Sequence, residues 1–158
     1  MAETGASYNE VIRQMSRTRS GSTSTSKLNL AIEAVITLIN GMGNFAVMTR
    51  GALGTGNSLC CEVAPSVAQE VYLDKNAYIV LTLAMNGKHT NLQTLSDCLN
   101  NIIDTLTRMR EYPDGNGWEI VDITSGNFPR IIGREQDNSW LMAGDLILKI
   151  YRKDDETP

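Results

Sequence analysis

The residues between 92 and 109 limit the possible folds of this chain more than any other segment. Apolar side chains recur there at steps of three and four, which is the spacing of one helix face. They are Leu92, Leu95, Leu99, Ile102, Ile103, Leu106 and Met109. Thr90 and Gln93 have the spacing of a capping box, and turn residues at 112–117 end the pattern. A long helix with one buried face is therefore expected here.

Alternating apolar residues, typical of strands, occur on both sides of that helix. The candidate strands are 45–49, 67–74, 77–86, 118–124, 128–132 and 140–152, and 27–40 has the pattern of another amphipathic helix. In 118–124, alternation places Trp118, Ile120 and Asp122 on one face and Val121 and Ile123 on the other. Because the order is not a regular βαβ repeat, we expect an α+β fold. It has a largely antiparallel sheet of four to five strands, with two amphipathic helices packed on one face.

The composition changes sharply near residue 26. Residues 16–26 are all Ser, Thr, Gly or Arg, which is typical of a flexible linker. Before them, a short stripe of apolar residues at helical spacing comprises Tyr8, Val11, Ile12 and Met15. We therefore divide the chain into an N-terminal arm and linker, 1–26, and a single α+β domain, 27–158. A domain of this length is long enough to bury its own core.

The charge and the N-terminal residues exclude several classes of protein. The formal net charge of −4 argues against a protein that grips phosphates, which would have a basic face. The N-terminal residues lack the apolar core of a signal peptide, and no apolar run reaches the roughly eighteen residues of a membrane helix. We expect a soluble protein made in the cytosol, without a membrane partner.

Histidine and cysteine residues offer few candidates for catalysis or metal binding. His89, the single histidine, has the position of a general base or of a turn residue before the helix, and no orienting partner is readable near it. Cys60, Cys61, Cys98 and His89 have the number of ligands that zinc takes, but adjacent cysteines have the wrong spacing. The alternative is that the cysteines are free thiols packed as small hydrophobes. We assign no catalytic, metal or cofactor residues.

A glycine-rich segment at 51–58 resembles a phosphate-binding loop at first sight. A Walker loop ends in Lys followed by Ser or Thr, whereas this one ends in Asn57 and Ser58 and opens no predicted helix. We therefore interpret it as an exposed loop that contacts other subunits or partners, through Arg50, Leu53 and Asn57.

The order of segments in the second half of the chain forms a recognisable pattern. Its first part is the segment from Pro65 to Asn86, followed by the helix from Leu92 to Met109. Its second part is Pro129, a polar turn, and a long strand that begins at Trp140 and ends in Tyr151, Arg152 and Lys153. With this pattern the chain is similar to the tail terminator and minor capsid proteins of long-tailed bacteriophages. The similarity covers residues 28–153 and has no invariant catalytic motif. The arm and the glycine-rich loop look longer than the family pattern.

The resemblance implies a structural virion protein and no enzyme. In this family a hexameric ring of identical subunits caps the tail tube, ends its polymerisation and joins it to the head connector or stopper protein. DNA passes through the central hole without specific binding, and an acidic lumen would let it slide. Such a protein assembles in the host cytoplasm and resides in the tail or neck of the virion. A ring closes only when two unlike surfaces of the subunit match.

For these contacts we predict three regions. They are the positive arm (Arg13, Arg17 and Arg19), the loop (Arg50, Leu53 and Asn57), and an edge formed by the final strand (Trp140, Tyr151 and Arg152). Three alternatives remain open. The first is another neck component, such as a head-completion or connector protein. The second is a small nucleotide- or metal-binding enzyme centred on the glycine-rich loop, and the third is a regulatory module whose arm contacts nucleic acid.

Overall fold

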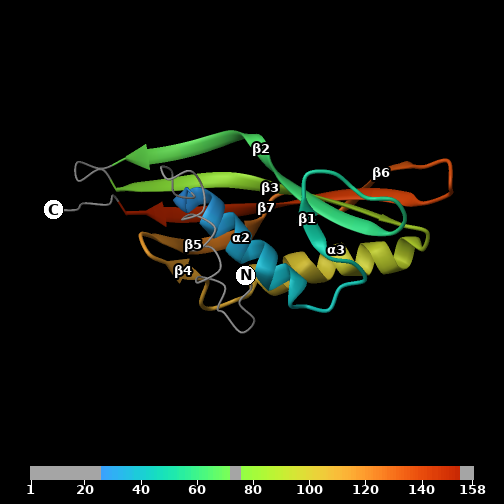
Figure 1. The fold of residues 1–158 in the computed structure, drawn as a ribbon, viewed down its shortest axis with the longest axis horizontal. Coiled ribbons are helices and arrows are strands. Elements are labelled where there is room, and N and C mark those ends of the chain that lie inside the picture. The colour runs from blue at the N-terminus through green and yellow to red at the C-terminus, as the bar shows by residue number, and fades with distance from the viewer. Residues whose placement is uncertain (1–25, 72–75, 154–158) are drawn as a thin grey trace, which may run out of the picture.

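The computed structural model describes residues 26–71 and 76–153, which form two helices and a seven-stranded sheet (Figure 1). The helices are α2 (Lys27–Asn40) and α3 (Leu92–Thr107). The strands are β1 (Met48–Arg50), β2 (Ser58–Val71), β3 (Ala77–His89), β4 (Asp114–Gly115), β5 (Trp118–Ser125), β6 (Arg130–Arg134) and β7 (Trp140–Arg152). The predicted arm lies outside the described residues apart from Ser26.

The strand order in the sheet is β1-β2-β3-β7-β5-β4, and β6 pairs with β7 beyond the end of β5. β1 pairs with β2 in parallel, and every other pair is antiparallel. The predicted α+β class is therefore confirmed, and so is the largely antiparallel sheet. The predicted number of four to five strands is too low. The two-residue β4 was not among the candidate strands. Residues 58–66, which the neighbouring glycines made look like a loop, lengthen β2 without adding a strand.

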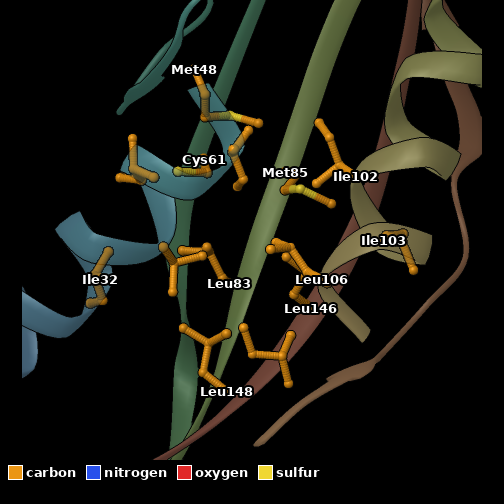
Figure 2. Packing of buried hydrophobic residues seen from close by; sticks show 14 of the residues in the cluster. Ile32, Met48, Cys61, Leu83, Met85, Ile102, Ile103, Leu106, Leu146 and Leu148 are labelled. Atoms are coloured by element: carbon orange, nitrogen blue, oxygen red, sulfur yellow. The ribbon is translucent and has the colours of Figure 1, made fainter. Parts of the chain in front are cut away.

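Both helices pack on one face of this sheet, as the sequence predicts. The buried cluster contains six residues of α2 and five of α3, together with alternate residues of the strands. Figure 2 shows side chains of the two helices meeting those of β3 and β7, with Cys61 and Met48 at the β2 side. Alternate residues of β3 are buried on the face towards the helices: Ile79, Leu81, Leu83 and Met85.

Two local predictions are wrong. The cap of α3 is Asn91, whose side chain accepts a hydrogen bond from the Thr94 amide, so Thr90 and Gln93 form no capping box. In β5 the strict alternation fails, because the register shifts between Ile120 and Asp122. This bulge adds one residue, so Ile123 is buried beside Ile120 while Val121 is exposed.

The packing of α3 generates a first prediction. Leu99 is fully buried, so Leu99→Ala should lower the free energy of unfolding by about 2–5 kcal/mol through lost burial and the cavity left behind. The matched control is Thr105→Ala, on the exposed side of the same helix, which should change it by less than about 0.5 kcal/mol. Chemical denaturation followed by circular dichroism measures both. Equal effects would show that α3 does not pack as described.

Candidate functional site

The final strand does not provide the free edge that the sequence suggested. β7 is paired along its whole length with β3 on one side, and with β5 and β6 on the other. Its two ends, with Trp140 at one and Tyr151 and Arg152 at the other, lie roughly 40 Å apart, because a strand rises about 3.3 Å per residue. These three residues therefore do not form one contact surface, and the prediction of a β7 edge is wrong.

The open edges of the sheet lie elsewhere. Within the described residues, β1 has no strand on its outer side, and neither has β2 beyond the short β1. On the opposite side of the sheet, β6 pairs only with β7 and β4 only with β5. Strands with unpaired N–H and C=O groups are templates for pairing with another chain. These edges are therefore the candidate functional site.

The β1 and β6 edges lie at the same level of the sheet. One row of paired residues crosses β1, β2, β3, β7 and β6 there. In that order, the residues are Met48, Leu59, Gly87, Met142 and Ile131. Following the pairings from strand to strand, β1 runs in the same direction as β2 and β7, and β6 runs opposite to them. The two edges are thus unlike in sequence, antiparallel to each other and level with each other.

Large apolar residues are exposed beside both of these edges. Val47, just before β1, is 67% exposed, and Phe128, just before β6, is 70% exposed. Ile131 and Ile132 on β6 are each 52% exposed, and a further exposed apolar residue, Val121, lies at the β5 bulge. Exposed apolar residues gathered on an unpaired edge mark a contact surface. None of these residues was predicted as a contact residue, although 128–132 was a candidate strand and its two adjacent isoleucines follow a proline.

The turn between β6 and β7 is closely held by local interactions. The Glu135 amide donates to the Ser139 carbonyl at 2.8 Å, and Asn138 adopts a positive φ of 70°, which Asn tolerates better than most residues. The Ser139 backbone amide donates to the Asp137 carboxylate at 3.0 Å, and hydrogen bonds from Ser139 hold the pKa of Asp137 below its ordinary value. β6 is thus positioned by a well-formed turn.

Two contacts of side chains fix the same hairpin on the rest of the sheet. The Arg134 guanidinium lies 4.2 Å from the centre of the Trp140 ring, a cation–π contact. The ammonium of Lys88, on β3, lies 3.8 Å from a carboxylate oxygen of Glu135, and Lys88 itself is buried. Because these contacts hold the hairpin, the apolar residues of β6 are presented on a supported strand.

The opposite edge is supported by the predicted loop residue Arg50. Its guanidinium donates to Glu62 at 2.9 Å and to Asn29 on α2 at 3.1 Å, which ties β1 to both β2 and the helix layer. The backbone amide of Val63, followed by Arg50, holds the pKa of the Glu62 carboxyl below its ordinary value. Arg50 is therefore a structural residue of this edge as well as a predicted contact.

The glycine-rich loop has a backbone role. It connects β1 to β2, which are parallel neighbours, through only residues 51–57, where parallel strands usually need a longer crossover. Gly51 and Gly56 have φ values of 108° and 76°, a region that other residues rarely adopt, and so the chain can double back. Asn57 accepts a hydrogen bond from the Thr90 amide at 3.3 Å, and Leu53 is half-buried. The loop leads into a strand and not into a helix N-terminus, unlike a phosphate-binding loop.

The candidate zinc ligands do not come together. Cys60 and Cys61 are consecutive residues of β2, so their side chains point to opposite faces, and Cys61 belongs to the buried cluster. Cys98 lies on α3 with its thiol 3.6 Å from the Asn44 side-chain oxygen. All three cysteines are free thiols, as predicted. Among the described residues, no group of three or more His, Cys, Asp or Glu could hold a metal ion.

His89 has a local structural role. Its Nδ1 accepts a hydrogen bond from the Asn91 amide at 2.8 Å, just before α3. Its ring packs edge-on against Phe45 with 4.6 Å between ring centres. These contacts agree with the interpretation of His89 as a turn residue before the helix.

The other predicted contact residues have partners inside the domain or lie outside the described chain. Tyr151 packs its ring against Tyr78 at 4.9 Å, and its hydroxyl accepts a hydrogen bond from Asn76 at 2.8 Å. Arg152 is half-buried at the same end of β7. Arg13, Arg17 and Arg19 fall in the part of the arm that is not described, so their roles stay predictions.

Comparison with known proteins adds no relative. No protein-family model matches the chain, and no curated protein matches it. In the described part of the chain, neither helix has the length and apolar character needed to cross a membrane.

The burial of Cys61 generates a second prediction. Burial raises the pKa of this thiol to about 12, against an ordinary value of 9.0. The folded state therefore holds its proton more tightly than the unfolded state, and this stability is present below pH 9 and lost as the pH rises towards 12. Between these values the contribution should fall by up to about 1.4 kcal/mol per pH unit.

The measurement is chemical denaturation of the native chain and of Cys61→Ala at several pH values from 8 to 11. Other groups also titrate in this range, but they are common to both proteins, so the difference isolates Cys61. The free energy of unfolding should fall more steeply for the native chain. Parallel pH profiles would show that the thiol is not buried as described.

Proposed function

We propose that this chain is a structural subunit that assembles with copies of itself through the β1 and β6 edges. The observation that carries the proposal is that two unlike edges lie at one level of the sheet, each with exposed apolar residues beside it. A copy placed beside the first along the Met48–Ile131 row adds its β1 to β6 of its neighbour as an antiparallel strand. The sheet then continues from one subunit to the next.

The pairings give this contact a definite register. When Met48 of the next copy lies opposite Ile131, antiparallel pairing places Val47 of that copy opposite Ile132. Both side chains are exposed in the single subunit and would cover each other in the assembly. The same register places Arg130 opposite Thr49 of the next copy, which brings no charges of the same sign together.

A contact between unlike surfaces repeats with a rotation at each step. If the rotation closes, the product is a ring, and if it does not, the product is a filament. Since neighbouring strands of a sheet are twisted by about 20–25°, a sheet that continues through a subunit boundary carries rotation with it. The open edges therefore support a ring, which is the assembly that the resemblance to tail terminators implies.

On that resemblance we propose the particular role: a ring that caps the phage tail tube, ends its polymerisation and joins the tail to the head connector. The segments that carry the resemblance include α3, the central strands and Pro129, which lies just before β6. The net charge of −4 supports a ring through which DNA passes without being gripped. The subunit would then belong to the tail or neck of the virion.

The edge contact generates a third prediction, which is tested by placing opposite charges on its two sides. Ile132→Glu should raise the protein concentration at half-assembly at least tenfold, because a carboxylate would be buried in the contact. Val47→Lys should do the same, and the double variant should recover most of the assembly, since the new residues face each other across the boundary. Analytical ultracentrifugation measures the assembly, in the presence of tail tubes if the free protein is monomeric.

The matched control is Val121→Glu, which introduces the same charge at an exposed apolar residue away from both edges. It should leave assembly within about twofold of the native protein. Unfolding free energies of all variants should agree within about 0.5 kcal/mol, because the changed residues are exposed. Loss of assembly in the double variant, or an equal loss in the control, would reject the β1–β6 contact.

The role in the tail generates a fourth prediction. Electron microscopy of the protein mixed with the tail tube protein of the same phage should show a ring at one end of each tube and tubes of limited length. Val47→Lys should leave the tubes uncapped. Rings that bind the isolated connector and ignore the tube would assign the protein to another part of the neck. Absence of rings in every mixture would reject the proposed function.

A further inference from the structure

The point where the arm joins the domain is held at one end of the sheet. The ammonium of Lys27, the first residue of α2, donates to the backbone carbonyl of Lys153 at 2.6 Å. Its side chain also covers Gly117, where an added Cβ would lie 2.7 Å from Lys27 Cε. The Lys153 amide in turn donates to the Gly117 carbonyl at 2.9 Å. The arm therefore leaves the domain where β5 begins and β7 ends.

A cavity opens at the same end of the sheet. It has a volume of about 160 Å³, and Gly117 and Lys153, which hold Lys27, belong to its lining. The other lining residues that matter for binding are Asp114, Trp118, Glu119 and Tyr151. The cavity thus combines two carboxylates with two aromatic rings. Carboxylates and aromatic rings are the groups against which a guanidinium binds well.

The two carboxylates lie opposite each other on neighbouring strands. Asp114 on β4 lies directly opposite Glu119 on β5, and side chains of the same charge in this arrangement destabilise a strand pair. Within the described residues, no hydrogen bond or salt bridge joins either carboxylate to a cation, although Lys153 lines the same cavity. A further cation between Asp114 and Glu119 would remove this repulsion.

The arm carries the matching charge at a suitable distance. Residues 11–25 contain Arg13, Arg17 and Arg19 and no acidic residue. Arg19 is seven residues before Ser26, which an extended chain spans in roughly 23 Å, so it can reach a cavity beside the attachment point. A short tether also gives the arm an effective concentration in the millimolar range at its own domain.

We propose that the arm folds back on its own domain and places the Arg19 guanidinium in this cavity, between Asp114 and Glu119. Docked there, the arm also covers β4, which is the open strand at this end of the sheet. The β1 and β6 edges at the other end stay open. This proposal stands independently of the β1–β6 contact and of any role in a phage tail.

The test uses the full chain with a lysine in place of one arginine of the arm, because residues 1–25 contain no lysine. A zero-length carbodiimide reagent joins a lysine amine to a carboxylate only when the two are in contact. Arg19→Lys should give a cross-link to Asp114 or Glu119, located by mass spectrometry of the digested protein. The yield of this cross-link should be at least about five times the yield of cross-links to Asp97 and Asp104, which are exposed carboxylates on α3.

Two controls make the result decisive. Arg13→Lys carries the same reactive group farther along the arm and should give at most one fifth of the Arg19→Lys yield at Asp114 and Glu119. In an equal mixture of ¹⁵N-labelled and unlabelled Arg19→Lys protein, the cross-linked peptides should be wholly labelled or wholly unlabelled. Mixed peptides would show that the arm docks on another copy, and an equal yield from Arg13→Lys or no link to these carboxylates would also overturn the proposal.

Discussion

The pairing of β3 with β7 is the interaction on which the rest of the structure depends. Thirteen residues of each strand pair, from Ala77 opposite Arg152 to His89 opposite Trp140. Alternate residues of both strands face α2 and α3 and form the centre of the core. Because side chains alternate with a period of two, a slip by one residue would turn this whole apolar set away from the helices. The other strands add to this pair, so the positions of both open edges follow from its register.

The parts of the fold that could be predicted are those with an unbroken local pattern. β3 and α3 alternate or repeat along most of their length, and their buried faces agree with the sequence. β7 buries its alternating residues Leu146, Leu148 and Ile150, although Met142, Ala143 and Gly144 are buried in a row. β2 could not be recognised in full, because glycines precede it and Pro65 interrupts it, although its pairing with β3 continues on both sides of a register shift. The bulge in β5 was hidden for a different reason: the position of the extra residue at Val121 is decided by pairing with the partner strand, and the hydropathy pattern does not reveal it.

The candidate site could likewise be predicted only in part from the sequence. An alternating pattern in residues 140–152 indicates that one face is buried, but it does not tell whether neighbours occupy both edges of the strand. That depends on β5 and β6, which reach β7 from other parts of the chain. The prediction of an edge at Trp140, Tyr151 and Arg152 therefore failed. Arg50, predicted as a contact residue of the loop, lies at the end of the short edge strand β1, and its contact with another subunit stays a prediction. Exposure of Ile131 and Ile132 is likewise a result of topology.

The charges on β6 favour a contact between unlike edges over one between two identical edges. If two β6 strands paired about a twofold axis centred on Ile132, Arg130 of one copy would lie opposite Arg134 of the other, and this would occur twice. Like charges directly opposite are destabilising, and Arg134 would have to remain on Trp140 at the same time. Pairing with β1 avoids this, because Thr49 and Val47 oppose Arg130 and Ile132. The sequence of β6 thus disfavours the symmetric dimer, and the remaining head-to-tail contact is the kind from which rings are built.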